Sequence, residues 1–327
     1  MPGKIWIVVQ HRDGKLHRMS REAVVAGQKL AAAVGGTAQA VVLGHGVEPV
    51  VEALTHYELD AVLVAEAEAL VDYTPGAYIG VLAAAVAERS PTHLVFGHSY
   101  QNVDYMARLA QAVGGSLVSE VVGFEQGDEG LVWRRPIFGG KLQSRLRVSG
   151  PAPVVVSVQS GAFSADEAVA GSAERQSLDS AAAVPDREIL GVEEVSGEHV
   201  DLTAAEIVVA VGRGLGDPQK MGIIEDLAAA LGAEIGASRP VIDSGWLPRD
   251  RQIGSSGQTV APKLYLAVGV SGAIQHLVGM KGAGTIVAIN KDAGAPIFAI
   301  ADYGIVGDLH EIVPALTAAV REAKAGS

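Results

Sequence analysis

The sequence predicts an α/β protein of two domains, each built on a mostly parallel sheet covered by helices. The chain has 327 residues, which is about two domains at roughly 100 to 200 residues per domain. Hydrophobic residues make up 49% of it and charged residues 19%, so it can bury large cores. Short β-branched runs alternate with alanine-rich stretches, which is typical of parallel strands joined by helices.

The N-terminal part carries this alternation most clearly, up to about residue 113. Ser20 precedes its first helical stretch, and its hydroxyl can accept from first-turn amides, so Ser20 is the expected N-cap. A strand over 154–158 completes the expected parallel sheet. Before it we expect strands over 5–9, 40–43, 61–64 and 93–96, and helices over 21–34, 46–54, 78–88 and 104–113.

Residues 116–147 change to strand-like segments broken by glycines, which predicts hairpins appended to the sheet. This piece is also locally basic. Two interpretations stay open for it, a solvated edge whose charges discourage aggregation or a contact surface for a partner. Its cations are Arg134, Arg135, Lys141, Arg145 and Arg147.

Residues 165–200 are rich in Ala, Ser, Asp and Glu with little periodicity, so we expect an acidic linker there between domains at 1–195 and 196–327. They hold nine acidic residues against Arg175 and Arg187, more than half of the formal net charge of −12. The two domains are then much nearer to neutral. This charge disfavours a polyanion such as nucleic acid, but not a small phosphate-bearing ligand.

From residue 201 a second alternating unit begins, with strands expected over 207–211, 264–270, 285–289 and 297–301 and helices over 218–231 and 308–322. Two turns follow its strands, Gly212–Gly216 and Ser271–His276. Their glycines let the backbone approach a ligand, and a following helix would offer free amides to an anion. The first turn lacks the dinucleotide-binding spacing, and an ordinary tight turn explains it equally well. Both lie where open α/β sheets bind ligands.

Other polar segments of this unit fit an anionic ligand. Residues 236–240 and 249–258 concentrate arginine, small hydroxyl residues and glycine; a flexible loop with its charges in water is the alternative. Asn290 and Asp308 follow later strands. They suit ribose hydroxyls or an adenine edge, and equally suit turns and helix caps.

Several chemistries lack the residues they need. The chain has no cysteine, which removes disulfides, thiolate metal sites and cysteine nucleophiles. No hydrolase triad order, H-E-x-x-H helix or P-loop lysine is present, and we expect no metal site. No segment reaches the roughly 18 apolar residues of a membrane span, so we expect a cytoplasmic protein without direct membrane insertion.

Five segments in a fixed order resemble the α subunit of electron transfer flavoproteins. The resemblance covers about residues 200–320, while the first half resembles the family in length and αβ alternation. It implies a C-terminal Rossmann-like or flavodoxin-like domain that binds FAD, and a first domain that pairs with a β subunit of related fold. The five segments are Val211–Leu215, Gly236–Arg239, Ser271–His276, Ala288–Asp292 and Ala301–Val306.

The resemblance also implies roles for individual residues. Ser238 and Arg239 would lie beside the isoalloxazine ring, and His276 would approach its pyrimidine carbonyl. The diphosphate, ribityl and adenosine parts would be held by Arg213, Ser271, Asn290 and Asp308. The full set implied to bind FAD is Arg213, Ser238, Arg239, Ile253, Gly254, Ser255, Ser256, Ser271, Gly272, Ala273, Ile274, Gln275, His276, Asn290, Asp308 and Leu309.

One loop departs from the family pattern. The family usually has Gly-Gln-Thr/Ser-Gly where this chain has Gly254-Ser255-Ser256-Gly257. Ser256 keeps the hydroxyl that would approach flavin N5, but Ser255 replaces the glutamine and its amide. Because reduction puts negative charge on the N1–C2=O region, a fixed Arg239 and a donor His276 would raise the flavin potential.

These residues imply an electron carrier rather than an enzyme. We expect a heterodimer with an electron transfer flavoprotein β subunit, which takes single electrons from flavin dehydrogenases, such as the acyl-CoA dehydrogenases of fatty acid β-oxidation, and passes them to a quinone oxidoreductase. An electron-bifurcating flavoprotein that oxidises NADH is the close alternative. A nicotinamide-dependent dehydrogenase and a non-catalytic nucleotide-binding module are more remote.

Overall fold

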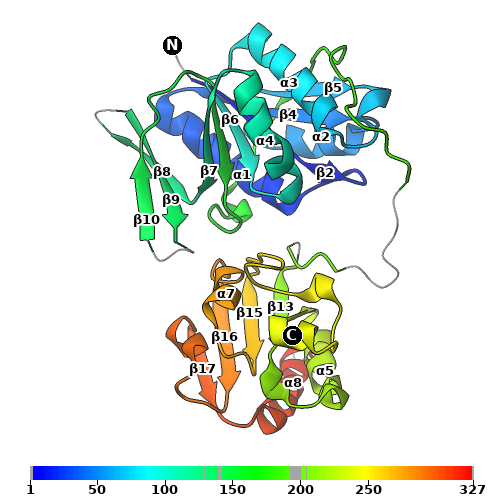
Figure 1. The fold of residues 1–327 in the computed structure, drawn as a ribbon, viewed down its shortest axis with the longest axis vertical. Coiled ribbons are helices and arrows are strands. Elements are labelled where there is room, and N and C mark those ends of the chain that lie inside the picture. The colour runs from blue at the N-terminus through cyan, green and yellow to red at the C-terminus, as the bar shows by residue number, and fades with distance from the viewer. Residues whose placement is uncertain (1–2, 128–129, 139–141, 192–199, 204, 326–327) are drawn as a thin grey trace. The chain divides into compact units, whose positions relative to one another are not determined.

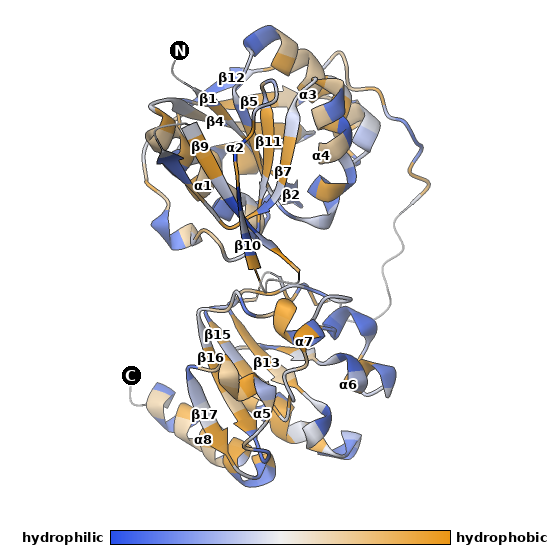
Figure 2. Ribbon diagram, turned by 60° about the vertical axis from the view of Figure 1, so that its left-hand side comes forward, coloured by the Kyte–Doolittle hydropathy of each residue, from blue (hydrophilic) through white to orange (hydrophobic). Residues whose placement is uncertain are grey.

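The computed structural model describes residues 3–127, 130–138, 142–191, 200–203 and 205–325. The chain divides into two compact units, Met1–Glu193 and Glu194–Ser327. Each unit contains a parallel sheet with helices (Figure 1), which confirms the predicted fold class. In Figure 2 the hydrophobic residues concentrate in the strands of both sheets. Every helix in the described ranges is too short or too polar to cross a bilayer.

The first unit is built on a seven-stranded sheet in which every neighbouring pair of strands is parallel. Side chains of its central strands are buried on both faces, as Ile5, Trp6 and Ile7 show, which is why these strands read as continuous apolar runs. In order across the sheet, the strands are β12 (Glu174–Ser177), β5 (Ala61–Glu66), β4 (Thr37–Gly44), β1 (Lys4–Val8), β6 (His93–Gly97), β11 (Val154–Val158) and β7 (Ser116–Val121).

Helices cover both faces of this sheet. On the face that carries Ile5 and Ile7 lie α1 (Arg18–Val34) and α2 (Glu48–Thr55). The opposite face, which carries Trp6, is covered by α3 (Pro75–Arg89) and α4 (Tyr100–Ala112). Each helix lies close to its predicted range. The apolar residues from which the sequence predicts a helix are the same residues that the helix buries against the sheet.

The predicted cap of the first helix is wrong. Helix α1 starts after His17, whose Nδ1 accepts from the Met19 N–H. Ser20 lies inside the helix, and its hydroxyl donates to the carbonyl of Gln10. The hydroxyl therefore serves a tertiary contact to the loop after β1, which the local cap pattern does not reveal.

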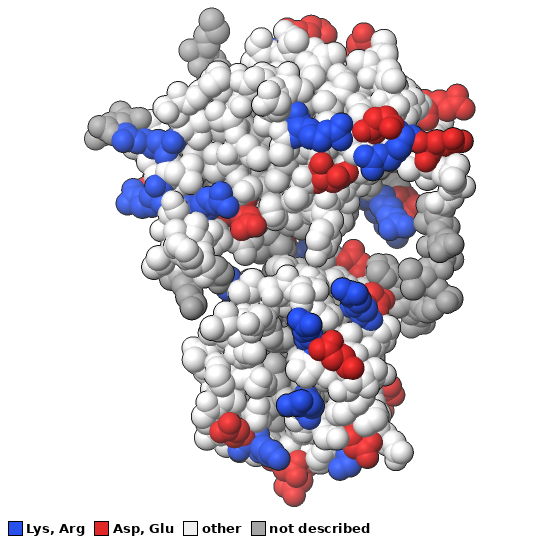
Figure 3. Space-filling model, in the orientation of Figure 1, with Lys and Arg blue, Asp and Glu red and all other residues white. Residues whose placement is uncertain are grey.

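Three strands form an antiparallel sheet, in the order β10 (Leu142–Leu146), β9 (Gly130–Ile137) and β8 (Gly123–Gly127). This confirms the appended hairpins, although β7 instead joins the parallel sheet beside β11. In Figure 3 Lys and Arg side chains gather over this sheet, while both signs are interspersed elsewhere on the visible face. A small two-stranded ribbon, β2 (His11–Arg12) with β3 (Lys15–Leu16), follows β1.

The sequence predicts a linker over 165–200, but the first part of this stretch belongs to the first unit. Strand β12 pairs in parallel with β5 as the edge of the sheet, and Leu178 after it is buried. All four β12 side chains are exposed, so the strand carries no apolar alternation by which the sequence could predict it. Residues 192–199 lie outside the described ranges.

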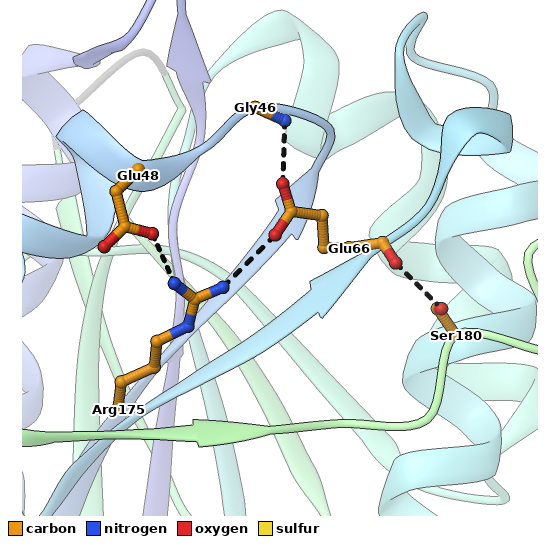
Figure 4. Close-up of polar contacts among 5 residues, drawn as sticks. All are labelled: Gly46, Glu48, Glu66, Arg175 and Ser180. Atoms are coloured by element: carbon orange, nitrogen blue, oxygen red, sulfur yellow. Dashed lines mark hydrogen bonds and ion pairs between the residues drawn. The ribbon is translucent and has the colours of Figure 1, made fainter.

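Ion pairs and hydrogen bonds hold this edge strand in place (Figure 4). Arg175 of β12 pairs with Glu48 and, at 3.2 Å, with Glu66. Glu66 also accepts from the Gly46 N–H, and its backbone carbonyl accepts from the Ser180 hydroxyl. An arginine of the acidic stretch therefore neutralises carboxylates of α2 and β5 and fixes the stretch to the first unit.

The second unit contains a five-stranded parallel sheet. Numbered along the chain its strand order is 2-1-3-4-5, the flavodoxin-like doubly wound order. This confirms the predicted architecture of the C-terminal domain. Across the sheet the strands are β14 (Glu234–Ala237), β13 (Ile207–Val211), β15 (Leu264–Val268), β16 (Thr285–Asn290) and β17 (Tyr303–Val306).

One face of this sheet packs against α5 (Gly222–Leu231), α6 (Arg239–Asp243) and α8 (Leu309–Ala325). The other face is covered by α7 (Ile274–Val278) and by loops. Short 3-10 helices complete the described secondary structure at Glu68–Leu70, Ala165–Glu167, Arg213–Leu215, Pro218–Lys220, Arg249–Arg251 and Pro296–Ala299.

The strand predicted over 297–301 is wrong. Its residues fall largely in the 3-10 helix Pro296–Ala299, and the edge strand is β17, a few residues later. Ile297 is fully buried, and its N–H donates to the carbonyl of Ser271. The apolar run therefore packs on the sheet as a 3-10 helix. A short buried helix and a buried strand are equally hydrophobic, so the sequence pattern alone does not distinguish them.

Candidate functional site

All five strands of the second unit end at one cavity of about 1060 Å³. It lies where β13 and β15 are neighbours while the chain runs from β13 to β14 on the other side, which is the switch point at which such sheets bind ligands. Every lining residue belongs to this unit. The lining consists of Arg213, Gly214, Leu215, Gly216, Lys220, Ser238, Arg239, Pro240, Asp243, Gln252, Ile253, Gly254, Ser255, Ser256, Gly269, Val270, Ser271, Ala273, Gln275, His276, Asn290, Lys291, Asp292, Ala295, Pro296, Gly307, Asp308, Leu309 and His310.

The loops after β13 and β15 cross at a separation that only glycine allows. A Cβ on Gly212 would lie 2.1 Å from the carbonyl oxygen of Gly269, and one on Gly214 would lie 2.7 Å from the same atom. The Gly214 N–H donates to that oxygen. These glycines therefore have a packing role, and Gly214 and Gly216 also line the cavity. The tight turn is therefore confirmed, while ligand binding at this turn stays a prediction.

The charges around the cavity favour an anionic ligand. Two arginines and two lysines line it against three aspartates, Asp243, Asp292 and Asp308. Arg239 pairs with Asp243 at 3.3 Å, but its side chain remains 67% exposed. Among the cations, Lys220 lies outside the five segments that carry the resemblance, whereas Lys291 lies within Ala288–Asp292 although no role is predicted for it.

Asn290 and Asp308 line the cavity and also fix its backbone. The side-chain amide of Asn290 donates to the Val270 carbonyl, and its oxygen accepts from the Asp292 N–H. Asp308 accepts from the His310 N–H at the start of α8. The capping alternative therefore applies to both residues, and it leaves them positioned at the cavity.

The 252–258 loop packs tightly against α7. Gly254 has φ +140°, and a Cβ there would lie 2.7 Å from the carbonyl oxygen of Gln275, which accepts from the Ser255 N–H. Gln252 is buried and donates to the Ser256 hydroxyl at 2.9 Å. An amide is thus present beside Ser256 although Ser255 replaces the family's glutamine.

His276 is one of the buried polar residues of the cavity wall, together with Ser238 and Gln252. It is 6% exposed, and its Nε2 lies 2.8 Å from the hydroxyl of Tyr265. Burial lowers the pKa of His276 to about 4, with the Ile253 backbone acting in the opposite direction. Nδ1 is buried and makes no hydrogen bond of acceptable geometry within the described residues. Since Nδ1 has almost no accessible surface, it does not face the open cavity, and the Ile253 backbone is the polar group that acts on the ring besides Tyr265.

Two of the predicted binding residues do not line the cavity. Gly272 has φ +83°, and a Cβ there would lie 2.3 Å from the backbone nitrogen of Ile297, so this glycine serves packing. Ile274 is 55% exposed. The other predicted residues all line the cavity. Tyr265 is missed because a tyrosine within an apolar strand looks like ordinary core.

Two family models match the chain. One, the electron transfer flavoprotein domain, covers residues 5–183, and the other, the electron transfer flavoprotein FAD-binding domain, covers residues 201–281. The electron transfer flavoprotein subunit alpha of Thermoanaerobacterium thermosaccharolyticum is 36% identical over 98% of this chain and 98% of its own. The chain belongs to the electron transfer flavoprotein α-subunit family.

Two further relatives match this chain over a similar share of its length. The subunit of the same name from Bacillus subtilis is 36% identical over 97% of both chains. The acryloyl-CoA reductase electron transfer subunit beta of Anaerotignum propionicum is 35% identical over 98% of this chain and 96% of its own. The matched FAD-binding domain includes Arg213, Ser271 and His276 of the cavity. FAD is therefore the cofactor, and the two arginines and two lysines of the cavity lining fit its diphosphate.

Proposed function

We propose that the chain is the α subunit of a cytoplasmic heterodimer that carries single electrons from flavin dehydrogenases, such as acyl-CoA dehydrogenases, to a quinone oxidoreductase. One observation carries the proposal. The domain that the family model describes as FAD-binding holds a cavity of about 1060 Å³ at its switch point, and two arginines and two lysines line it. The partner in the heterodimer is an electron transfer flavoprotein β subunit.

In this proposal, different residues bind different parts of the FAD. Arg213, Ser271, Asn290 and Asp308 hold the diphosphate, ribityl and adenosine parts. Ser238, Arg239, Ser256 and His276 surround the ring system. The bound FAD supplies one-electron chemistry, while the chain supplies a fixed positive charge and a neutral imidazole at pH 7.

The polar groups of the cavity favour a carrier over an enzyme that transforms a substrate. A general acid or base needs a pKa near the operating pH, and burial moves the pKa of His276 to about 4. Asp243 pairs with Arg239, and Asp308 caps α8. These side chains are therefore engaged in holding the site together.

The test is purification of the heterodimer with its β subunit, followed by flavin analysis and reduction. We expect FAD in a fixed ratio to the heterodimer, reduced by an acyl-CoA dehydrogenase with its substrate and reoxidised by a quinone oxidoreductase. Purified heterodimer without flavin absorbance, and with no gain of FAD when it is added, would contradict the proposal.

An electron-bifurcating flavoprotein is the second candidate. One relative is named as an electron transfer subunit of acryloyl-CoA reductase, so a reductase is an alternative redox partner to a quinone oxidoreductase. Addition of NADH separates the two. One FAD per heterodimer and no reduction by NADH support the simple carrier, whereas two flavins and direct reduction by NADH support bifurcation.

A further inference from the structure

Gln258 closes the 252–258 loop of the cavity wall. Its backbone N–H donates to the Gln252 carbonyl at 2.7 Å, and its carbonyl accepts from the Gly254 N–H at 3.2 Å. The closure is tight, because a Cβ on Gly257 would lie 2.3 Å from the same Gln252 oxygen. Residues 252–256 all line the cavity, whereas Gln258 does not. Any influence of the Gln258 side chain on a ligand must therefore pass through this loop.

The side-chain amide of Gln258 joins this loop to Val200, the first residue of the second unit that the structure describes. Its Nε2 donates to the carbonyl of Val200 at 3.0 Å and also to the carbonyl of Asp250. Both partners are acceptors, so the NH₂ group of the amide must face them, with one N–H for each. One half-buried residue therefore closes the loop with its backbone and holds Val200 with its side chain.

Val200 is held on both sides of its backbone. Its N–H donates to a carboxylate oxygen of Asp250 at 3.3 Å, while its carbonyl accepts from Gln258. Its side chain is 9% exposed and belongs to the same hydrophobic cluster as that of Ile253, which lines the cavity. The point where the chain enters the second unit is therefore attached to residues of the cavity loop and of the segment just before it.

We propose that Gln258 is a positioning residue that couples FAD binding to the attachment of Val200. The coupling rests on the proposed function, in which FAD occupies the cavity. A ligand that binds the closed loop and not the open one stabilises the closed loop. Since opening the loop at Gln258 also releases the Val200 carbonyl, the ligand stabilises the attachment of Val200 as well. The effect is reciprocal, so loss of this attachment weakens FAD binding by the same factor.

The first test measures hydrogen exchange at the Val200 amide. The full-length heterodimer is compared with FAD bound and after removal of the FAD. We expect this amide to exchange about threefold to tenfold more slowly with FAD bound, the range for one hydrogen bond. Equal exchange rates in the two samples would overturn the coupling while leaving FAD binding intact.

The second test replaces the amide with unbranched side chains. Gln258→Met removes both donors, whereas Gln258→Lys keeps a donor for each carbonyl. In Gln258→Met we expect Val200 to exchange at one rate with and without FAD, and FAD to dissociate about threefold to tenfold faster. Gln258→Lys should restore both properties, because the two partners need only a donor. Gln219→Met is the matched control, at an exposed glutamine of the same unit that does not line the cavity, and should change neither.

The outcomes separate the two proposals. A folded Gln258→Met variant that releases FAD at the wild-type rate, or in which Val200 exchange still depends on FAD, would refute the role of Gln258. A Gln258→Lys variant that behaves like Gln258→Met would refute it too, since the effect would then come from packing. Should Gln258→Met not fold, the comparison of the wild-type protein with and without FAD still decides. A wild-type heterodimer that binds no FAD would refute the proposed function and the coupling together, whereas bound FAD without an effect at Val200 refutes the coupling alone.

Discussion

The two units share an architecture and differ at the carboxyl edge of the sheet. In the first unit the side chains there bond to one another: Ser99 donates to the Gln10 side chain, and His98 Nδ1 lies 2.8 Å from the Ser157 hydroxyl. In the second unit the same edge opens into a cavity of about 1060 Å³ that two arginines and two lysines line. The fold provides the edge, but the pairing of the polar groups on it decides where a ligand binds.

The largest effect is expected from a substitution that destabilises the second unit alone. Gly272→Ala adds a Cβ 2.3 Å from the backbone nitrogen of Ile297 at a residue with φ +83°. We expect a loss of about 3 kcal/mol or more in the unfolding free energy of this unit, since both strain and a clash arise. Hydrogen exchange, read separately for each unit, measures it.

Gly222→Ala is the control for this substitution. Gly222 is the first residue of α5, and a Cβ there meets no atom within 4 Å. Because alanine favours a helix over glycine by about 1 kcal/mol, this variant should be neutral or slightly stabilised. Equal protection of the second unit in both variants would show that Gly272 does not hold the loop under the cavity.

The elements that the sequence predicts well are those buried on both faces. The apolar runs Ile207–Val211 and Val154–Val158 match strands β13 and β11 residue for residue, because their burial and their sequence pattern have the same cause. Strands β12 and β14 are short and carry exposed residues, so they have no such pattern. Their pairing is decided by neighbours that are distant in the sequence.

The same reasoning explains which residues of the site the sequence predicts and which it misses. The Ser271–His276 turn is predicted because a turn with glycine and a polar side chain is local. Tyr265, Lys220 and Lys291 are not, since each owes its role to a contact across the fold. Gly272 has a local signal, but glycine serves packing and ligand approach equally well, so its role in binding stays a prediction.

Acid should weaken both units, through a different histidine in each. Burial lowers the pKa of His93 in the first unit and of His276 in the second to about 4. Each ring stays neutral in the folded state and is protonated in the unfolded state below about pH 6.5. The stabilisation from each is therefore complete above pH 6.5 and is lost as the pH falls toward 4, by up to about 3 kcal/mol per histidine.

Hydrogen exchange between pH 7 and 4 checks this unit by unit. His93→Gln should flatten the pH dependence of the first unit only, and His276→Gln that of the second only. A variant that flattened the other unit, or neither, would contradict the assignment of the acid sensitivity to these two rings.

A smaller effect is expected at the edge of the first unit. Ser99 caps α4 by accepting from the Asn102 N–H and also donates to Gln10. Ser99→Ala should cost the first unit about 1 kcal/mol of unfolding free energy, with FAD binding unchanged. Ser172→Ala, at an exposed serine of the same unit, is the control. Weaker FAD binding in Ser99→Ala would contradict the contrast between the two units, because the carboxyl edge of the first sheet would then also affect ligand binding.

The smallest change in stability is expected where the effect on the flavin is clearest. Arg239 is 67% exposed and pairs with Asp243 four residues later, so Arg239→Ala should alter unfolding by no more than about 0.5 kcal/mol. It should lower the flavin reduction potential, because it removes a positive charge from the cavity wall. Arg321→Ala is matched to it, with a 59% exposed arginine in an ion pair with Asp226 away from the cavity. An equal shift in potential from both would mean that only the overall charge matters. A shift in potential from Arg239→Ala alone would place the guanidinium beside the flavin ring. Arg239 would then affect the ligand with little effect on stability, whereas Ser99 is expected to affect the stability of its unit and not ligand binding.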